Sequence, residues 1–261
     1  MEENHFTAKK TTPIPWTARW EAPSNIALIK YWGKTTPQIP KNPSLSFTLS
    51  SSVTQTQVVF EPVSSGAFDF NFYFEGVAKP DFKPKLQTFF KRIESYIPWI
   101  QGYQLTIKSH NTFPHSSGIA SSASAMAALA MCLMDLEQKL VSDMEPEFFH
   151  QKASFLARLG SGSAARSIQG PVTLWGVNKM QDRSSDLYAI PFGLDLHPVF
   201  STYQDAILLV DKGTKAVSSS QGHQLMHQHP FASQRFLQAA ANLEALVPVM
   251  KAGDLEAFIK I

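Results

Sequence analysis

Cysteine is nearly absent from this chain, with Cys132 as the one example among 261 residues. A single cysteine excludes an intramolecular disulfide and a cysteine-based zinc cluster. Because Cys132 stands inside an apolar run, we predict that it fills space in the core and is not a catalytic thiol.

Charge is also scarce: charged residues make up 17% of the chain, and the formal net charge is +2. This charge provides no broad basic field, which argues against nucleic acid as a partner and requires any anion site to be local. No apolar run is long enough to span a bilayer, and the N-terminus lacks the apolar core of a signal peptide. We therefore expect a soluble, cytoplasmic protein with no membrane partner.

The apolar fraction of 44%, with nineteen phenylalanines, is typical of a globular protein of one large domain or two smaller ones. Residues 1–15 are polar and are expected to form a loose arm. Alternation and short apolar runs predict strands at 17–22, 45–49, 53–60, 69–74, 104–108, 172–175 and 206–210, with a serine turn after the second. Helical spacing predicts helices at 86–97, from the serine pair 121–122 to about 136, at 146–159, at 231–247 and from 254 onward.

Residues 111–126 begin as a loop with serines, Pro114 and Gly118, and continue as an alanine-rich apolar helix. Unpaired backbone N–H groups, serine hydroxyls and the helix dipole together favour a phosphate at such a junction. It is not a Walker loop, because the glycine spacing differs and no lysine precedes the serine pair. The alternative is a serine-rich connector in which Ser121 or Ser122 only caps a core helix.

Two further serine-rich loops lie at 160–167 and 218–220. With the first loop and with Lys30, Lys34 and Arg166, they would form a double-anion site for a nucleotide triphosphate and a phosphorylated or carboxylated small molecule. The alternative is that the serines form turns and the lysines face water. Lys30, within an apolar run, either is buried beside an anion or extends its ammonium group outward.

Metal-ligand spacing is poor in this sequence. His223, His227 and His229 stand close together, but in a polar stretch next to a proline, which favours a surface loop over a zinc site. There is no Gly-x-Ser-x-Gly elbow and no convincing Ser/His/Asp arrangement, so a hydrolase is disfavoured. We predict no metal site built from side chains.

Residues 22–34, Ala-Pro-Ser-Asn-Ile-Ala-Leu-Ile-Lys-Tyr-Trp-Gly-Lys, resemble the N-terminal signature of the diphosphomevalonate decarboxylases. Residues 114–123 resemble the nucleotide-phosphate loop of their superfamily, which is named for galactokinase, homoserine kinase, mevalonate kinase and phosphomevalonate kinase (GHMP). Residues 157–167 resemble the decarboxylase substrate loop, and residues 217–222 a further family segment. The resemblance implies an α+β GHMP kinase fold. Its parts would be a flexible arm (1–16), an ATP-binding lobe like domain 2 of ribosomal protein S5 (17–195), and the start of a truncated ferredoxin-like lobe (196–261).

The resemblance also implies an activity: ATP phosphorylates the 3-hydroxyl of mevalonate 5-diphosphate, and loss of phosphate and CO₂ gives isopentenyl diphosphate. By position, the residues expected to contact ATP, with Mg²⁺ as its counter-ion, are Pro114, Gly118, Ala120, Ser121 and Ser122. Those expected to hold the substrate are Asn25, Tyr31, Lys34, Ser161, Gly162 and Ser219. Those expected to act in catalysis are Lys30, Arg166 and Ser163.

The sequence also departs from the family pattern. Thr35 and Thr36 stand where relatives often have Arg-Asp, and residues 115–117 are His-Ser-Ser instead of smaller or less polar residues. The family's catalytic aspartate is expected downstream of Ile261, so we expect the 261-residue chain to be catalytically defective and its parent to be an active decarboxylase. From the resemblance we also expect a homodimer. The alternatives are a 3-kinase that does not decarboxylate and a non-catalytic phosphometabolite-binding protein.

Overall fold

The computed structural model describes residues 3–64, 68–114, 119–192, 196–208, 222 and 225–261, and it confirms the predicted α+β class. The strands are β1 (Trp16–Ile29), β2 (Lys34–Thr35), β3 (Ile39–Pro40), β4 (Ser44–Pro62), β5 (Asp69–Phe74), β6 (Val77–Ala78), β7 (Tyr103–Asn111), β8 (Val172–Trp175) and β9 (Ala189–Pro191). The helices are α1 (Lys83–Ile93), α2 (Ser121–Leu140), α3 (Pro146–Gly160), α5 (Ala232–Ala252) and α6 (Leu255–Lys260). Short 3₁₀ turns include η1 (Glu3–Phe6) and η4 (Gly162–Ser167).

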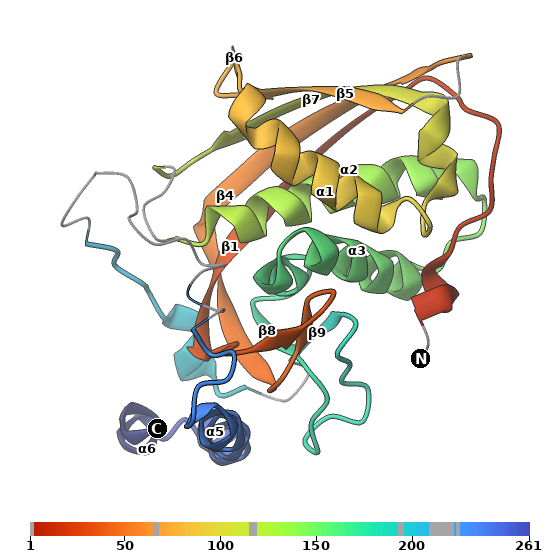
Figure 1. Cartoon of the computed structure of the whole chain (residues 1–261). Helices are drawn as coiled ribbons and strands as arrows, with labels where there is room; N and C mark the ends of the chain where they lie inside the picture. The colour runs from red at the N-terminus through yellow and green to blue at the C-terminus, as the bar shows by residue number, and fades with distance from the viewer. Residues whose placement is uncertain (1–2, 65–67, 115–118, 193–195, 209–221, 223–224) are drawn as a thin grey trace.

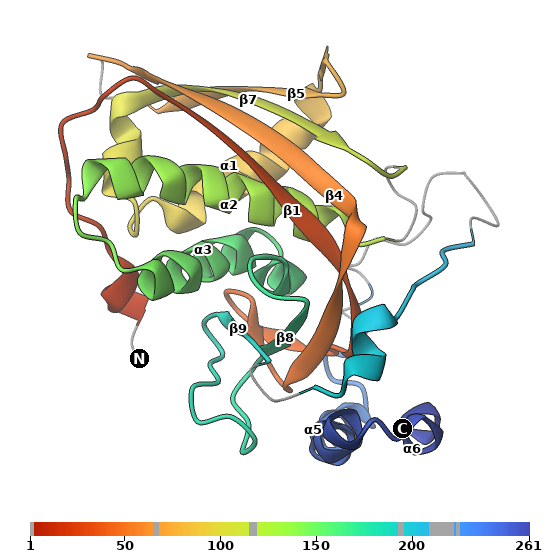
Figure 2. The ribbon, with the colours of Figure 1, turned by 180° about the vertical axis from the view of Figure 1, so that it is seen from behind.

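The main sheet has the strand order β6-β5-β7-β4-β8-β9, with β1 paired to β4. Helices α1, α2 and α3 lie on one side of this sheet, and α5 and α6 lie at the opposite end of the molecule, beyond β8 (Figure 1). The view from behind shows β1 and β4 running together from one end of the molecule to the other (Figure 2). These two long strands therefore join the helix-covered part of the sheet to the part that carries β8 and β9.

Strand β4 corrects the prediction of two strands with a serine turn between them. It is continuous from Ser44 to Pro62, pairing with β8 in its first half and with β7 in its second. Between the pairs Ser24–Leu49 and Pro23–Val53 the register shifts, so residues 50–52 form an irregularity within the ladder. A cluster of serines is compatible with either outcome, since a bulge and a turn both interrupt regular pairing.

Helix α2 fills the space beneath the sheet, as its apolar composition predicts. Ala127, Ala128 and Ala130 are fully buried, and small side chains allow the helix to approach β1 and β4 closely. Cys132 is buried among them, its thiol reaching the carbonyl oxygen of Thr56 at 3.4 Å. Burial raises the pKa of this thiol, which confirms its role as core filler.

Several other predicted elements agree with the structure. Strands at 69–74 and 172–175 and the strand at 104–108 are β5, β8 and the centre of β7. The side chain of Asp254 accepts a hydrogen bond from the Ala257 amide and caps α6, as predicted.

The strand predicted at 206–210 is wrong for residues 206–208, which have no regular structure, and its last two residues lie outside the described part. Within the residues that the structure describes, no helix combines the length and apolar character needed to cross a bilayer.

The prediction of a loose N-terminal arm is wrong for residues 3–6. Phe6 is fully buried and stacks on Phe155 of α3, with 4.6 Å between ring centroids. The Glu3 carboxylate accepts a hydrogen bond from the Tyr96 hydroxyl at 2.8 Å and pairs with Arg158 at 3.2 Å. Polar composition suggested a mobile segment, but one phenylalanine and one carboxylate with buried partners anchor it.

We predict that Phe6→Ala lowers the free energy of unfolding by about 3–5 kcal/mol, because it removes a fully buried aromatic side chain and leaves a cavity. Urea unfolding followed by circular dichroism measures the loss. Phe231→Ala is the matched control, since that ring is 70% exposed and its removal costs little. Equal unfolding midpoints for both variants would contradict the burial of Phe6.

Candidate active site

A cavity of about 560 Å³ lies where the first turn of α2, the η4 loop, the end of β1 and the start of α1 meet. Most of the described residues predicted for the site line it together: Asn25, Lys30, Tyr31, Lys34, Ala120, Ser121, Ser122, Ser161, Gly162, Ser163 and Arg166. Pro114 is exposed and is not among the described lining residues. Gly118, Ser219 and the 218–220 loop lie outside the described residues. The structure therefore brings two of the three predicted serine loops to one cavity.

The first loop leads into α2 through Ala120, which adopts a left-handed backbone conformation with φ of 48°. Ser121 and Ser122 are the first residues of the helix, Ala120 occupies the N-cap position, and among the described residues no side-chain hydrogen bond caps the helix. The alternative prediction that one of these serines serves as the cap is therefore wrong. The Ser122 hydroxyl instead lies 3.3 Å from the Ser161 hydroxyl of the second loop. Both loops thus present donors to the same space, at a helix N-terminus.

The second loop, η4, follows directly from α3 and is fixed from beneath. The hydroxyl of buried Ser154 donates to the carbonyl oxygen of Ala165 at 2.8 Å and accepts from the Ala189 amide. Gly162 allows the loop to lie against Tyr31, since a Cβ atom at that position would be 2.9 Å from the tyrosine hydroxyl oxygen. Side chains larger than hydrogen would therefore displace either the loop or Tyr31.

Arg166, the last cation of η4, is only 3% exposed. Its guanidinium donates to the Ser44 hydroxyl and to the Asn25 side-chain oxygen and lies 5.9 Å from the Trp175 ring centre. Its Nε has no hydrogen-bond partner among the residues that the structure describes. Burial lowers the pKa of Arg166 to about 10. Among the described residues it forms no ion pair with a carboxylate, so an anion in the cavity would supply the missing charge.

Lys30 is exposed and lines the cavity, so it is not a buried cation, and its role in the site stays a prediction. Its ammonium lies 5.6 Å from the Trp32 ring centre. The buried side chain of Asn42 holds this backbone segment, accepting from the Trp32 amide at 3.2 Å and donating to the Lys30 carbonyl at 2.9 Å. The backbone of Lys30 is therefore fixed by Asn42, and its ammonium group lies near the Trp32 ring.

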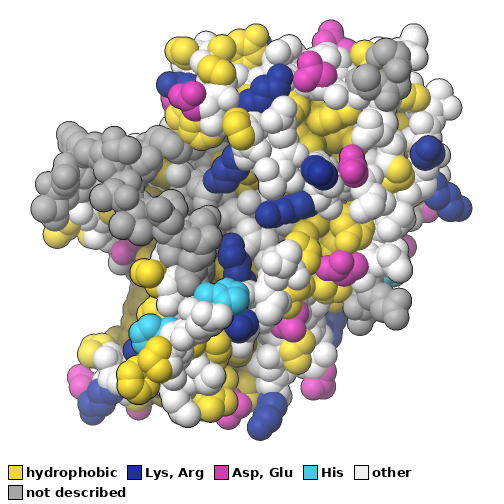
Figure 3. Space-filling model, in the orientation of Figure 1, with side chains coloured by type: hydrophobic (Ala, Val, Ile, Leu, Met, Phe, Trp, Pro, Cys, Tyr) yellow, Lys and Arg dark blue, Asp and Glu magenta, His cyan; other side chains and the backbone are white. Residues whose placement is uncertain are grey.

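The cavity is strongly cationic. Lys30, Lys34, Lys85 and Arg166 line it, and the described lining residues include no aspartate or glutamate. Figure 3 shows basic side chains down the middle of this face of the molecule. Lys34 donates to the Gln38 side-chain oxygen at 2.8 Å, and burial, followed by the charge of Arg92, lowers the pKa of Lys34. Uncompensated cations with hydroxyl and amide donors are suited to a polyanionic ligand.

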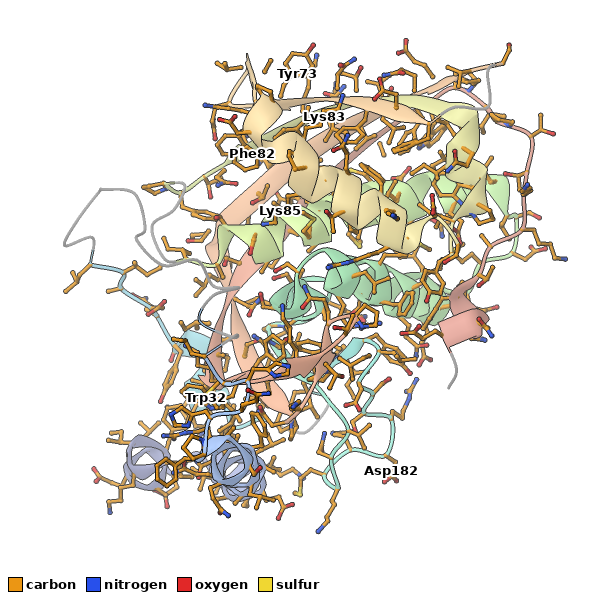
Figure 4. All side chains as sticks on the ribbon, viewed as in Figure 1. Trp32, Tyr73, Phe82, Lys83, Lys85 and Asp182 are labelled. Atoms are coloured by element: carbon orange, nitrogen blue, oxygen red, sulfur yellow. The ribbon has the colours of Figure 1, made fainter. Side chains whose placement is uncertain are left out.

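Part of the cavity wall is apolar and was not predicted from the sequence. Its residues include Phe72, Phe74, Phe82, Leu86 and Ile107. Figure 4 shows Phe82 and Lys85 at the start of α1, beside the space above α2. The alternation Phe70-x-Phe72-x-Phe74 in β5 is the one signal that could have revealed an aromatic face, but periodicity cannot distinguish a core from a cavity wall.

The family profile that matches this chain is the diphosphomevalonate decarboxylase-like N-terminal domain, over residues 22–188. The chain belongs to this family. A diphosphomevalonate decarboxylase of Ganoderma lucidum is 30% identical over 94% of this chain and 62% of its own length, and that of Saccharomyces cerevisiae is 32% identical over 80% and 53%. The chain thus spans about half to two thirds of the length of these curated relatives.

Solved structures of mevalonate diphosphate decarboxylases share the fold, which confirms the predicted GHMP kinase fold. The Staphylococcus aureus enzyme matches with a TM-score of 0.74 at 27% identity, over 94% of this chain and 70% of that one. The complex of MDDEF with MVAPP, AMPPCP and magnesium matches with a TM-score of 0.73 at 26% identity, over 94% and 71%. The matched region of this diphosphomevalonate decarboxylase-like domain contains all of the described residues that line the cavity.

We predict that anion affinity decreases with rising pH, beginning below 10.5, the ordinary lysine pKa. The pKa of Lys34 is lowered in the free protein, and its cationic form binds the anion. Affinity is therefore complete below that pKa and is lost as pH rises through it. Lys34→Arg should reduce the decrease, because a guanidinium keeps its charge.

Calorimetric titration with inorganic pyrophosphate between pH 7 and pH 10 tests this prediction. The ratio of wild-type to Lys34→Arg affinity is the quantity to follow, because the ionisation of pyrophosphate itself cancels in that ratio. The ratio should decline with pH, and a constant ratio would show that Lys34 does not titrate against the ligand.

Proposed function

We propose that the protein containing this chain is an ATP-dependent decarboxylase of mevalonate 5-diphosphate that forms isopentenyl diphosphate. The observation that carries the proposal is buried Arg166, whose Nε lacks a partner and which no carboxylate neutralises in the described structure. A substrate carboxylate would supply both the charge and the acceptor. Membership of the decarboxylase-like family and the likeness to solved decarboxylases support the same function.

We propose that the two anionic ends of the substrate occupy different parts of the cationic wall. Tyr31, Lys34 and Ser161, with Gly162 beside them, would hold the diphosphate, and Arg166 would hold the carboxylate. Ser219 stays a predicted contact outside the described residues. Asn25 accepts from Arg166 and donates to the Ser163 carbonyl at 3.1 Å, so it links Arg166 to the start of η4.

ATP would place its phosphates at Ser121 and Ser122, with its base toward the apolar wall at Phe72 and Phe82. The pairing of a polar end and an aromatic wall fits a nucleotide triphosphate. The lining has hydroxyls and no described carboxylate, so Mg²⁺ would be held chiefly by the ATP phosphate oxygens and would neutralise their charge. The MDDEF complex with AMPPCP and magnesium supports these cofactors.

The reaction transfers the γ-phosphoryl group to the tertiary 3-hydroxyl, whose proton is released. Phosphate then leaves with the C–O bonding electrons, and the bond to the carboxylate supplies the electrons of the new double bond as CO₂ departs. Lys30 would stabilise charge at the reacting oxygen, and Ser163 would position that oxygen. Fixed cations and hydroxyls that do not attack the electron-deficient carbon are the groups this chemistry requires.

A 3-kinase would share these contacts but release no CO₂, so product analysis separates the two functions. Turnover is best measured with the longest natural form of the protein, and ligand binding with the 261-residue chain. ADP and CO₂ in equal amounts would support the decarboxylase, whereas ADP alone would support the kinase. The predicted homodimer stays a prediction.

We predict that Arg166→Met reduces kcat/KM for CO₂ release by about 10²–10³, because it removes the charge that holds the departing carboxylate, and leaves ATP affinity unchanged. Arg183→Met is the control, since this arginine is 69% exposed and pairs with Glu147 on the surface. Retention of wild-type decarboxylation by Arg166→Met would reject the proposed function of this residue.

A further inference from the structure

One part of the cavity wall belongs to neither the main sheet nor a helix. Strands β2 and β3 pair only with each other and form a small hairpin, residues 33–41, which we name the Lys34 hairpin. It carries two cavity-lining residues, Lys34 and Gln38. With only two residue pairs, such a hairpin has little intrinsic stability, so contacts from elsewhere must fix its tip.

The contact that reaches the tip comes from Arg158 of α3, which is fully buried. Its Nη1 donates to the Pro37 carbonyl oxygen at 2.6 Å, and its Nε donates to the Leu187 carbonyl oxygen at 2.8 Å. Its Nη2 pairs with Glu3 at 3.2 Å. The fork of one guanidinium therefore ties the hairpin to the segment before β9 and to the N-terminal turn.

The Pro37 carbonyl belongs to the peptide that enters Gln38. Gln38 has a positive φ of 62°, an unfavourable conformation for a residue other than glycine. Its side-chain oxygen accepts from the Lys34 ammonium group at 2.8 Å. By holding the Pro37 carbonyl, Arg158 holds Gln38 in this conformation, and Gln38 in turn directs the ammonium group of Lys34 into the cavity.

We infer that Arg158 is a positioning residue for the diphosphate end of the site, acting through Pro37, Gln38 and Lys34. Arg158 is not among the described residues that line the cavity, so it acts without touching the ligand. Glu3 completes the arrangement: its carboxylate neutralises Arg158 and is held by the Tyr96 hydroxyl at 2.8 Å. The assignment of the diphosphate to Lys34 rests on the proposed function, whereas the effect on anion binding does not.

The test is a binding comparison on the 261-residue chain, with inorganic pyrophosphate and ATP as separate probes. Arg158→Lys can keep one of the three hydrogen bonds and should weaken pyrophosphate about tenfold while leaving ATP within about twofold, because only the Lys34 hairpin is displaced. Gln38→Ala, at a half-buried position, should give a similar loss, and its thermal unfolding midpoint shows whether the variant is folded.

A double-mutant cycle measures whether Arg158 and Gln38 are coupled in pyrophosphate binding, which a purely structural role of Arg158 would not produce. Because Arg158 and Gln38 both act through Lys34, their losses of pyrophosphate affinity should not add. The double variant Arg158→Lys/Gln38→Ala should bind pyrophosphate about as tightly as the single variant with the lower affinity. Lys152→Gln is the matched control, since Lys152 is a fully buried cation of the same helix bonded to Glu137 and does not line the cavity. It should lose thermal stability but not pyrophosphate affinity.

Equal weakening of pyrophosphate and ATP in Arg158→Lys, additive losses in the cycle, or wild-type affinity in both single variants would overturn the inference. So would a wild-type chain that fails to bind pyrophosphate. Binding of mevalonate 5-diphosphate tests the proposed function separately from the inference about Arg158. If the wild-type chain binds pyrophosphate but not mevalonate 5-diphosphate, the proposed substrate is wrong. The inference about Arg158 is then still decided by the pyrophosphate affinities of the variants.

Discussion

An uncompensated buried cation is the constraint on which the site depends. The described structure buries three cationic side chains, and two of them have a carboxylate: Lys152 binds Glu137, and Arg158 binds Glu3. Arg166 is held only by a hydroxyl, a side-chain amide oxygen and an aromatic ring. Burying a cation without a counter-ion costs free energy, so the burial of Arg166 lowers the stability of the ligand-free protein. An anionic ligand would offset that cost.

The architecture provides the rigidity that this arrangement needs. The long pair β1 and β4 carries Asn25 and Ser44, the two polar partners of Arg166, on neighbouring strands of one ladder. Helix α2 packs closely beneath these strands through its alanines, so its first turn is fixed against the same ladder. The Lys34 hairpin lies outside the sheet, and it takes its position from Arg158 and from the hydrogen bonds of Asn42 at its base. The cavity therefore combines Arg166, held on a rigid ladder, with Lys34, held on an anchored hairpin.

The sequence predicted those features that local pattern determines. Alternation located β5 and β8, helical spacing located α3, and motif resemblance located most of the described residues of the cationic wall. The misses depend on tertiary contacts. The sequence of residues 50–52 is compatible with a turn or with a bulge, and the pairing of β4 with β1 determines that they form an irregularity within one strand. Phe6 stands in a polar segment, and its burial depends on Phe155, about 150 residues away. Gln38 stands in no motif, and Arg158, although it lies within the 157–167 segment, had no predicted role, because both act through single hydrogen bonds across the fold.

The measurement that tests the central claim most directly is the thermal unfolding midpoint of the chain with mevalonate 5-diphosphate, compared with mevalonate at matched ionic strength. A ligand that binds only the folded state stabilises it by about 2.7 kcal/mol at a hundredfold excess over its Kd. An uncompensated cation cluster predicts a higher midpoint with mevalonate 5-diphosphate and a much smaller change with mevalonate, which has a carboxylate but no diphosphate. Equal midpoints with both compounds would contradict a cavity built to bind a polyanion.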